Sequence, residues 1–378
     1  MHILVAPNAF KNSLSAAYAA AAIQQGLQLS RLNCTSTCFP IADGGDGTGA
    51  LIMEHCKGII IKKEVSDPLG RKITSQLGLI DDGKTAVVEM ADASGLRLLK
   101  RGELDPLKTS SYGTGELIRF ALDAGVNKII IAMGGSATVD GGCGILSALG
   151  VKFFDADRRF LKPVPTDLID LAIIDVTGID SRVFNCEVVI LCDVNNKLLG
   201  PEGSAAVFGP QKGAGANDVI FLERFLTNFN FAAAAQYGKD MAGLQHGGAA
   251  GGAAAGLSAF LNAKLVNGIE YFLQVTGFDD ELKKSDLLIT GEGSLDQQTL
   301  GGKGPYGVAK HAKLNNIPVI GLAGKVPLNP SVELLQCFDT LMAIGNEPAD
   351  LSDALLNTKD NLVRSARAIG DILSIPNK

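Results

Sequence analysis

Short apolar segments of strand length alternate with helical segments at both ends of the chain. At the start, residues 2–6 predict a strand, residues 14–29 an alanine-rich helix, and residues 36–42 a second strand. Five such buried strands with covering helices predict an α/β fold, a flavodoxin-like domain with a doubly wound parallel sheet. The other predicted elements of this domain are a helix after residue 47, strands at 286–290, 318–323 and 340–344, and helices at 306–315 and 351–373.

The middle of the chain has a different pattern. Residues 59–100 carry two or three strands with no helix between them, and Asp81-Asp82-Gly83 is typical of a hairpin turn. Because 378 residues exceed the usual size of one hydrophobic core, we expect two domains. Residues 1–60 and 283–378 then form the flavodoxin-like domain, and residues 61–282 form an inserted mixed α/β domain. The inserted domain has further predicted strands at 128–133 and 187–192 and helices at 114–124, 140–149, 216–237 and 251–263.

Composition excludes several classes of protein. A net charge of −6, no block of Lys or Arg, no Trp and only 5 Tyr argue against nucleic-acid binding. The 7 scattered cysteines favour thiols in a reducing compartment over a disulfide framework. No apolar stretch approaches the ~18 residues of a membrane span, and the N-terminal apolar run is too short for a signal peptide. We therefore expect a cytoplasmic monomer or homodimer that binds small molecules, with no nucleic-acid or membrane partner.

Glycine-rich loops that carry a carboxylate or a lysine recur along the chain, at residues 42–48, 134–142, 208–213 and 291–296. Glycine lets backbone N–H groups approach an oxyanion closely, and neighbouring Asp or Glu side chains hold hard cations. The repeated pairing of the two predicts a site for phosphate with Mg²⁺, which is the chemistry of a kinase.

Three of the predicted strands in the flavodoxin-like domain deliver polar residues to one sheet edge. Lys11 and Ser13 follow the first strand, Asp43 and Asp46 follow the second, and the strand at 286–290 runs into Gly-Glu-Gly at Glu292. The carboxyl edge of an open α/β sheet is where ligands bind. The alternatives are a tight turn with an Asp cap at 43–46 and a helix cap at Ser13.

In the inserted domain, a glycine-rich loop lies between a strand and a helix. Its amides and hydroxyls are placed to bind phosphate at a helix N-terminus. The alternative is an ordinary helix cap with Asp140 in the first helical turn. Asp193 ends another predicted strand, and Gln211-Lys212 lies in another glycine-flanked loop.

One segment matches the P-loop pattern formally, at residues 78–85. A P-loop must open a helix, whereas Thr85 is followed by a β-rich run and Asp82-Gly83 is a hairpin turn. We therefore interpret this segment as a hairpin. The dinucleotide-binding fingerprint and the nucleophile elbow of serine hydrolases are both missing.

Taken together, these segments resemble the type 1 bacterial glycerate kinases over nearly the whole chain. The resemblance implies phosphorylation of D-glycerate, usually on its 2-hydroxyl, with ATP as co-substrate and Mg²⁺ as cofactor. It also implies a flavodoxin-like domain with an inserted restriction-enzyme-like domain, in agreement with the predicted layout. The matching segments are residues 6–11, 42–45, 112–118, 134–138, 208–213 and 290–293.

Phosphoryl transfer needs carboxylates for the metal, cations for the transferring phosphoryl group and a base near the acceptor hydroxyl. We expect Asp43 and Glu292, with Asp46, to hold Mg²⁺, and Asp193 or Asp296 to act as the base.

Lys11 and Lys212 are the cations expected to stabilise the transferring phosphoryl group. A cleft between the two domains is expected to close and exclude water. The residues expected to bind nucleotide, phosphate or substrate are Gly134, Gly135, Ser136, Thr138, Ser13, Gly291 and Gly293.

Five positions depart from the usual pattern of the resembled family. An arginine is usual at Ser294, and its loss removes a natural partner for phosphate or for the substrate carboxylate. Lys303, Arg71 or Arg119 are the possible substitutes. The departures are Asn8 for Asp, Asp46 for Glu, Val139 for Asn, Asn195 for Asp, and Ser294 for Arg.

Two other functions stay open from the sequence. One is a kinase that acts on the 3-hydroxyl of glycerate or on another short hydroxy acid. The other is a catalytically silent protein that binds glycerate or nucleotide.

Overall fold

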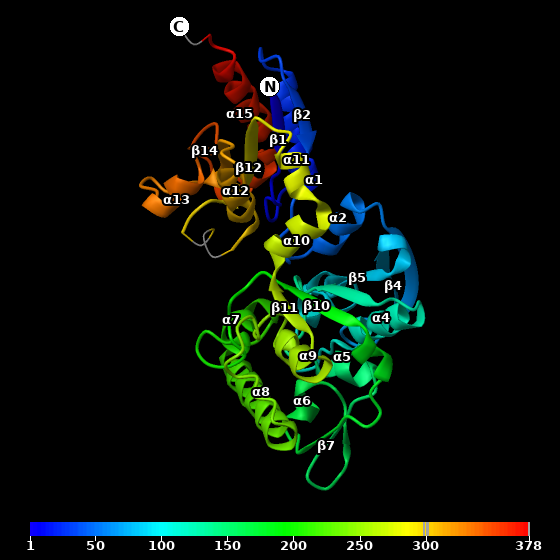
Figure 1. The fold of residues 1–378 in the computed structure, drawn as a ribbon. Helices are drawn as coiled ribbons and strands as arrows, with labels where there is room; N and C mark the ends of the chain where they lie inside the picture. Colours follow the sequence, from blue (N-terminus) through cyan, green and yellow to red (C-terminus); the bar gives the residue numbers. More distant parts are fainter. Residues whose placement is uncertain (298, 300–301, 377–378) are drawn as a thin grey trace. The chain divides into compact units, whose positions relative to one another are not determined.

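The computed structural model describes residues 1–297, 299 and 302–376, and it divides the chain into two compact units. The first comprises Met1–Asp43 and Ile269–Lys378, and the second comprises Gly44–Gly268. Both are drawn in Figure 1.

These divisions differ from the boundaries near 60 and 283 that the sequence suggested. Helix α2 (Thr48–His55) packs on β5 (Thr85–Glu89) and so belongs to the second unit. Helix α11 (Phe278–Leu282) belongs to the first unit, where the rings of Phe278 and Phe39 lie 5.3 Å apart, edge to face. Sequence periodicity marks these helices but does not say which core they cover.

The first unit contains a five-stranded parallel sheet in the order β14-β13-β12-β1-β2. Numbered along the chain within this sheet, the order is 2-1-3-4-5, which is the flavodoxin-like order. The predicted fold class is confirmed. The strands are β1 (His2–Val5), β2 (Thr35–Cys38), β12 (Leu287–Ser294), β13 (Val319–Lys325) and β14 (Thr340–Ala343).

Both faces of this sheet are buried. Ile3 and Val5 pack with α1 and α15, and Leu4, between them, is buried on the opposite face. Residues 351–373, predicted as one helix, form two helices that meet at Asn357. The helices of this unit are α1 (Ala16–Gln28), α10 (Gly268–Thr276), α11, α12 (Gly304–Leu314), α13 (Val332–Cys337), α14 (Leu351–Leu356) and α15 (Thr358–Leu373).

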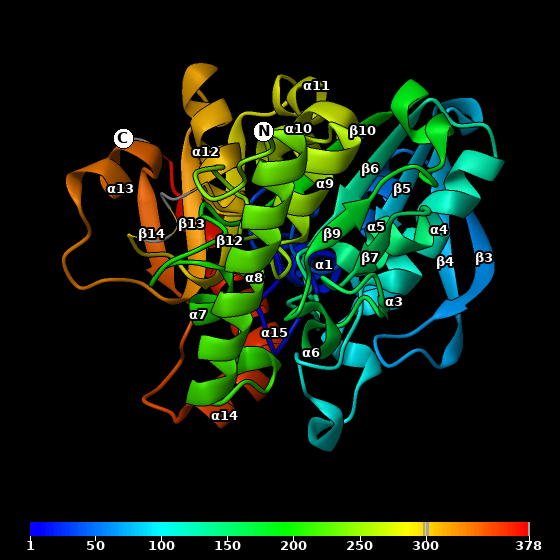
Figure 2. The same cartoon turned by 90° about the horizontal axis from the view of Figure 1, so that it is seen from below.

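The second unit contains a six-stranded mixed sheet in the order β11-β10-β6-β5-β4-β3. Strands β5, β6, β10 and β11 are parallel, and β4 and β3, the last two strands at one end of the sheet, pair antiparallel. Figure 2 shows β3, β4, β5, β6 and β10 side by side. The strands not yet bounded are β3 (Ile59–Ser66), β4 (Lys72–Ile80), β6 (Lys128–Ala132), β10 (Glu187–Cys192) and β11 (Lys264–Asn267).

The segment with the P-loop pattern is a hairpin, as predicted. Strand β4 ends at Ile80, a 3₁₀ turn follows at Asp81–Gly83, and β5 pairs antiparallel with β4. Asp82 and Gly83 have positive φ of 54° and 81°. This chain reversal opens no helix, so it offers no phosphate cradle.

Eight α-helices lie in the described part of the second unit, and most match predicted ones. A small sheet, β8-β7-β9, was not predicted because its strands have only two or three residues each. They are β7 (Lys152–Phe154), β8 (Phe160–Leu161) and β9 (Ile173–Asp175); the helices are α2, α3 (Ala91–Ser94), α4 (Tyr112–Asp123), α5 (Cys143–Ala148), α6 (Pro165–Leu168), α7 (Ser204–Phe208), α8 (Ala216–Tyr237) and α9 (Ala253–Leu261).

In the portion of the chain that the structure describes, none of the helices has the length and apolar character needed to cross a bilayer.

Candidate active site

In the first unit, polar residues meet where the strand order of the sheet reverses, between β1 and β12. The N–H of Asn8, just after β1, donates to the carbonyl oxygen of Gly291 on β12 at 2.8 Å. Glu292 is the next residue on β12, and Asp43 follows β2. This switch point is where open α/β sheets bind ligands. The predicted convergence at one sheet edge is therefore present for Asp43 and Glu292.

Asp43 is held by two donors. Nδ2 of Asn8 donates to Oδ2 of Asp43 at 3.0 Å, and the N–H of Gly304, at the start of α12, donates to the same oxygen at 3.2 Å. A helix N-terminus favours a negative charge. Asn8 is itself buried and donates this hydrogen bond to Asp43. An Asp at position 8 would instead place a second carboxylate next to Asp43, and the two would repel each other.

Glu292 is a buried carboxyl group, with 7% of its surface exposed. Burial raises its pKa to about 7; nearby Asp43 raises it further, whereas the cations Lys303 and Lys11 oppose the rise. The hydroxyl of Thr299 donates to Oε1 of Glu292 at 3.4 Å. A buried carboxyl group with a pKa near neutrality, among charged side chains, is characteristic of a functional site.

Asp296 lies on the same segment as Glu292. Oδ2 of Asp296 accepts a hydrogen bond from Ser294 at 2.9 Å, and its N–H donates to the hydroxyl of Thr299 at 3.1 Å. Thr299 thus links Asp296 to Glu292. The side chain at Ser294, the position of the missing arginine, contacts Asp296.

Of the three cations considered as substitutes for that arginine, Lys303 acts electrostatically on Glu292. Arg71 instead bonds to Asp67 and Glu103, and Arg119 acts electrostatically on Asp180, all within the second unit. Lys303 is therefore the substitute that the structure favours.

Ser13 and Gly291 of the first unit were both predicted to bind nucleotide, phosphate or substrate. The hydroxyl of Ser13 donates to the carbonyl oxygen of Leu355 at 2.6 Å, while the N-cap of α1 is Ser15. The alternative interpretation of Ser13 as the cap was wrong. A Cβ atom on Gly291 would lie 2.0 Å from the carbonyl oxygen of Leu322, so this glycine permits close strand packing.

Gly293 and Lys11 lie near each other. The backbone nitrogen of Lys11 is 3.9 Å from where a Cβ atom of Gly293 would stand, and the Lys11 residue is exposed. A side chain at Gly293 would therefore make an ordinary contact with the backbone of Lys11.

In the second unit, Asp46 belongs to a charged cluster at the N-terminus of α2. Oδ1 of Asp46 accepts from Nη1 of Arg97 at 2.8 Å, and Nη2 of Arg97 bonds to Asp92. Glu89 accepts from the N–H groups of Gly47 and Gly49. Burial and the nearby Asp46 raise the pKa of Glu89 to about 7, although the Gly47 bond opposes the rise.

The loop at residues 134–138 packs tightly against this cluster. The N–H of Gly134 donates to the carbonyl oxygen of Gly44 at 3.1 Å, and that of Leu96 donates to the carbonyl oxygen of Gly135 at 2.8 Å. A Cβ atom on Gly134 would lie 2.2 Å from the backbone of Gly45. These glycines allow two backbones to touch, which sequence alone cannot distinguish from a phosphate cradle.

The buried side chain of Lys212 contacts this loop. Its Nζ atom donates to Oγ of Ser136 at 2.8 Å and to the carbonyl oxygen of Thr138 at 2.7 Å. Lys212 is 2% exposed, and burial lowers its pKa to about 7, with Asp140 opposing the fall. The hydroxyl of Thr138 is buried without a hydrogen-bond partner. An unpartnered donor beside a buried amine suits an oxyanion.

Asp140 holds the helix that follows the loop. Its carboxylate accepts from both the N–H and the hydroxyl of Ser111 at 2.7 Å, from the N–H of Gly142 at 3.1 Å and from that of Gly144 at 3.2 Å. These bonds oppose the upward effect of complete burial on the pKa of Asp140. Asp140 therefore binds backbone amides at the start of α5 from a position before the helix, and not from the first helical turn as the alternative interpretation stated.

Asp193 follows β10, at the carboxyl edge of the second sheet. Its backbone nitrogen lies 3.3 Å from where a Cβ atom of Gly44 would stand, so Gly44 permits the 44–48 loop to approach it. Gly44 has φ of +101°, which also favours glycine.

The three predicted magnesium ligands are divided between the two units. Asp43 and Glu292 lie in the first unit and Asp46 in the second. Among the residues that the structure describes, no group of three or more His, Cys, Asp or Glu side chains is placed to hold a metal ion. Mg²⁺ is commonly held by one or two carboxylates plus phosphate oxygens and water. The pair Asp43 and Glu292 fits this donor set, because a cation would offset both the burial of the Glu292 charge and its repulsion by Asp43, which raise the pKa of Glu292.

Sequence reasoning missed Glu89 and Arg97. Glu89 is the last residue of β5, and its place in the β-rich run that follows Thr85 could have marked it as a residue at the carboxyl edge. Arg97 gave no signal, because only the fold brings it to Asp46.

Comparison with known proteins agrees with the geometry. The model of the glycerate kinase family matches residues 3–374. A protein named glycerate kinase from Bacillus subtilis (strain 168) is 42% identical, with 98% of this chain and 97% of that protein covered. One named glycerate 2-kinase from Escherichia coli (strain K12) is 39% identical, with 99% and 98% covered. A crystal structure of a candidate glycerate kinase 2 from Salmonella typhimurium LT2 superposes with a TM-score of 0.83 at 43% identity, covering 99% of this chain and 98% of that one.

The fold and these relatives define a phosphotransferase with an alcohol group as acceptor. The chain belongs to the glycerate kinase family. Membership of a kinase family implies ATP as co-substrate.

Proposed function

We propose that the protein transfers the γ-phosphoryl group of ATP to the 2-hydroxyl of D-glycerate, with Mg²⁺ as cofactor. The observation that carries this proposal is the pair formed by half-buried Asp43 and buried Glu292 at the switch point of the first sheet, with Lys11 and Lys303 as neighbouring cations. The choice of the 2-hydroxyl rests on the name of the Escherichia coli relative.

Asp43 and Glu292 would hold Mg²⁺, which when bound neutralises charge on the phosphate oxygens. Asn8 and the N–H of Gly304 orient Asp43, and Thr299 orients Glu292. Because Glu292 titrates near neutrality, metal binding near pH 7 displaces its proton.

Lys11 and Lys303 would stabilise negative charge on the phosphoryl group or on the carboxylate of glycerate. The base that accepts the proton of the acceptor hydroxyl is Asp296 or Asp193. Asp296 is favoured by its link through Thr299 to Glu292.

In the second unit, the hydroxyls of Ser136 and Thr138, with Lys212 behind them, would bind phosphate oxygens. Gly134 and Gly135 serve this loop by letting it pack on residues 44–46. Asp46 is paired with Arg97, so its role as a metal ligand requires that this ion pair opens. The expected closure of a cleft between the domains stays a prediction.

The deciding experiment is ³¹P NMR of the purified protein with MgATP and D-glycerate. We expect the signal of 2-phosphoglycerate. A 3-phosphoglycerate signal would keep the kinase and change the regiochemistry. If folded protein that still binds ATP gives no phosphorylated product, the proposed function is contradicted. The remaining hypothesis is then the catalytically silent binding protein.

A further inference from the structure

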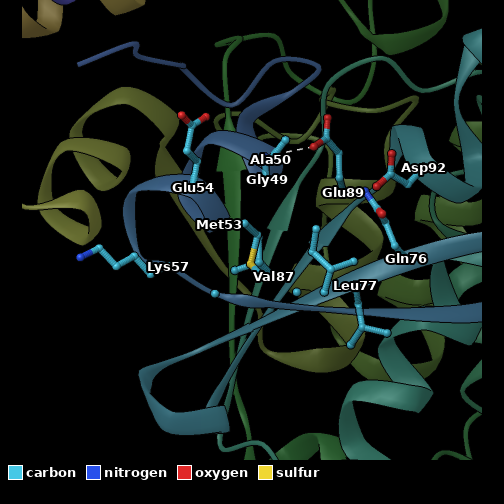
Figure 3. Close-up of a pocket in the computed structure, with 13 residues that line it drawn as sticks. Gly49, Ala50, Met53, Glu54, Lys57, Gln76, Leu77, Val87, Glu89 and Asp92 are labelled. Atoms are coloured by element: carbon cyan, nitrogen blue, oxygen red, sulfur yellow. Dashed lines mark hydrogen bonds between the residues drawn. The ribbon is translucent and has the colours of Figure 1, made fainter. Parts of the chain in front are cut away.

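A half-open pocket of 390 Å³ lies in the second unit between α2 and the edge of the sheet. Its floor is one face of three neighbouring strands, because Ile60 pairs with Gly78 and Gly78 pairs with Val87 across the ladders. Gly49 and Ala50 of α2 line the opposite wall. Figure 3 shows this pocket.

The floor of this pocket is apolar and flat. The thioether of Met53 lies over Gly78, where a Cβ atom would be 1.9 Å from the sulfur, and over Gly58, where one would be 2.3 Å from the terminal methyl group. Val87 and Leu77 complete the apolar lining. A methionine on glycine adapts its shape to a flat apolar ligand.

The polar residues of the pocket favour a neutral ligand over an anion. Figure 3 shows Glu89, Asp92 and Gln76 on one side of the pocket and Lys57 on the other. Glu54 is a third carboxylate in the lining. Because three carboxylates face one lysine, the pocket repels glycerate and phosphate, so neither is its occupant.

A second hollow shares part of its lining with this pocket and contains two basic side chains. It measures 450 Å³, shares Gln76 and Asp92 with the first, and adds Lys62 and Arg97. Lys62 and Gln76 are directly opposite each other on β3 and β4, so both face the same side of the sheet. These two cations suit the ribose phosphate end of a ligand.

Arg97 connects this hollow to the loop at 134–138. The residue before it, Leu96, donates its N–H to the carbonyl oxygen of Gly135, and Gly95 bridges to Ser136. Arg97 also bonds to Asp46, whose carboxylate carbon is 3.1 Å from where a Cβ atom of Gly135 would stand. The apolar pocket, the hollow that contains Lys62 and Arg97, and the loop at residues 134–138 are therefore neighbours in that order within the second unit.

We propose that the apolar pocket under α2 binds the adenine base of the nucleotide, with its phosphates leading past Arg97 to Ser136. This inference rests on the proposed function, since it names where the ATP of that reaction binds. The volume admits a flat bicyclic base, and the apolar floor covers one of its faces.

The polar side of the pocket suits adenine better than guanine. The carboxylates of Glu89 and Asp92 and the amide oxygen of Gln76 accept hydrogen bonds from the 6-amino group of adenine. Guanine carries a carbonyl oxygen at this position, which those oxygens repel. We therefore expect the KM for GTP to exceed that for ATP by roughly tenfold or more.

The test is the substitution Ala50→Trp, at an exposed position on α2 whose side chain borders the pocket. A tryptophan there fills the pocket without disturbing the core. We expect the KM for ATP to rise by at least about tenfold and the KM for D-glycerate to change less than about twofold. The matched control is Ala235→Trp, at an exposed alanine of α8 outside this pocket, for which neither KM changes.

Binding measurements separate this inference from the proposed function. By calorimetry, Ala50→Trp should lose affinity for ADP and adenosine but keep the affinity of the parent protein for inorganic tripolyphosphate. An unchanged KM for ATP, or unchanged ADP affinity, would overturn the adenine pocket while leaving the kinase in place. If the parent protein phosphorylates nothing but binds ADP in a manner that Ala50→Trp abolishes, the proposed function fails and the pocket stands.

Discussion

Asn8 donates a hydrogen bond from Nδ2 to Oδ2 of Asp43 across 3.0 Å, and this pair joins the end of β1 to the end of β2. Type 1 glycerate kinases usually have an Asp at the first position. In this chain an amide replaces that carboxylate, so the site carries one negative charge fewer beside Asp43 and Glu292.

Asn8→Asp should increase the dependence of the protein on Mg²⁺. Two carboxylates in this contact repel each other, which costs roughly 1–2 kcal/mol of unfolding free energy without metal. A divalent cation removes the repulsion. We expect a lower thermal midpoint than the parent protein in EDTA and a larger stabilisation by Mg²⁺. Asn8→Ala is the control, because it removes the donor without adding charge; equal Mg²⁺ stabilisation in all three proteins would contradict the prediction.

Glu292→Gln should abolish activity and stabilise the fold at alkaline pH. Because its pKa rises from 4.5 to about 7 on folding, the folded state holds this proton more tightly than the unfolded chain. The cost of ionising it is absent below about pH 4.5 and complete above about pH 7, where it reaches up to about 3 kcal/mol.

The neutral glutamine removes this cost, so the thermal midpoint of Glu292→Gln should exceed that of the parent protein at pH 8 and approach it near pH 5. Thermal unfolding without metal at both pH values tests this. A midpoint that is lower by the same amount at both pH values would show that Glu292 acts only through its hydrogen bond with Thr299.

The first unit could be predicted well because its signals are local. Buried strands with glycine-rich ends predicted the flavodoxin-like sheet, and the parallel arrangement then brought Asp43 and Glu292 to one edge without any knowledge of contacts. The division between the units could not be predicted, since it depends on which core α2 and α11 cover.

The second unit was predicted less completely because its polar groups act across long sequence distances. Lys212 reaches Ser136 across 76 residues, and Arg97 reaches Asp46 across 51. Glycines 134 and 135 gave the same sequence signal that a phosphate loop gives, although their observed role is close backbone packing. A glycine in the sequence indicates a position where a side chain would not fit, but it does not indicate whether a ligand or another backbone segment lies there.

Lys303→Ala should impair catalysis, and Ser294→Arg should compensate in part. Lys303 is the cation of the three considered that acts on Glu292, and Ser294 occupies the position at which an arginine is usual. We expect Lys303→Ala to lower kcat/KM for D-glycerate by roughly 10–100-fold, and the double variant to recover about tenfold. Steady-state kinetics test this. Arg71→Ala, which breaks the ion pairs with Asp67 and Glu103, is the control that should affect stability more than kinetics.

ATP binding should take up a proton on Lys212. The buried amine has a pKa lowered from 10.5 to about 7, so at pH 8 most of it is neutral. Protonation of this buried amine lowers the free energy of unfolding below about pH 7, and this destabilisation disappears as the pH rises to about 10.5. A phosphate at Ser136 favours the charged amine and raises its pKa.

Calorimetry of ATP binding at pH 8 in buffers of different ionisation enthalpy should therefore give an uptake of roughly one proton. Lys212→Met should abolish this uptake and weaken binding. Ser136→Ala, which removes one contact and leaves the amine, should retain most of the uptake. A binding enthalpy independent of the buffer in the parent protein would rule out the coupling.

Asp296→Asn should reduce kcat more than Asp193→Asn. A base must lie within hydrogen-bonding reach of the acceptor hydroxyl, and Asp296 shares Thr299 with the proposed metal ligand Glu292. Loss of a general base lowers kcat by roughly 10²–10⁴-fold while the affinity for ATP is retained. Single-turnover kinetics with calorimetric ATP affinities separate the two effects. If Asp193→Asn gives the larger loss, the base lies in the second unit, and if both variants keep the kcat of the parent protein, neither carboxylate is an essential base.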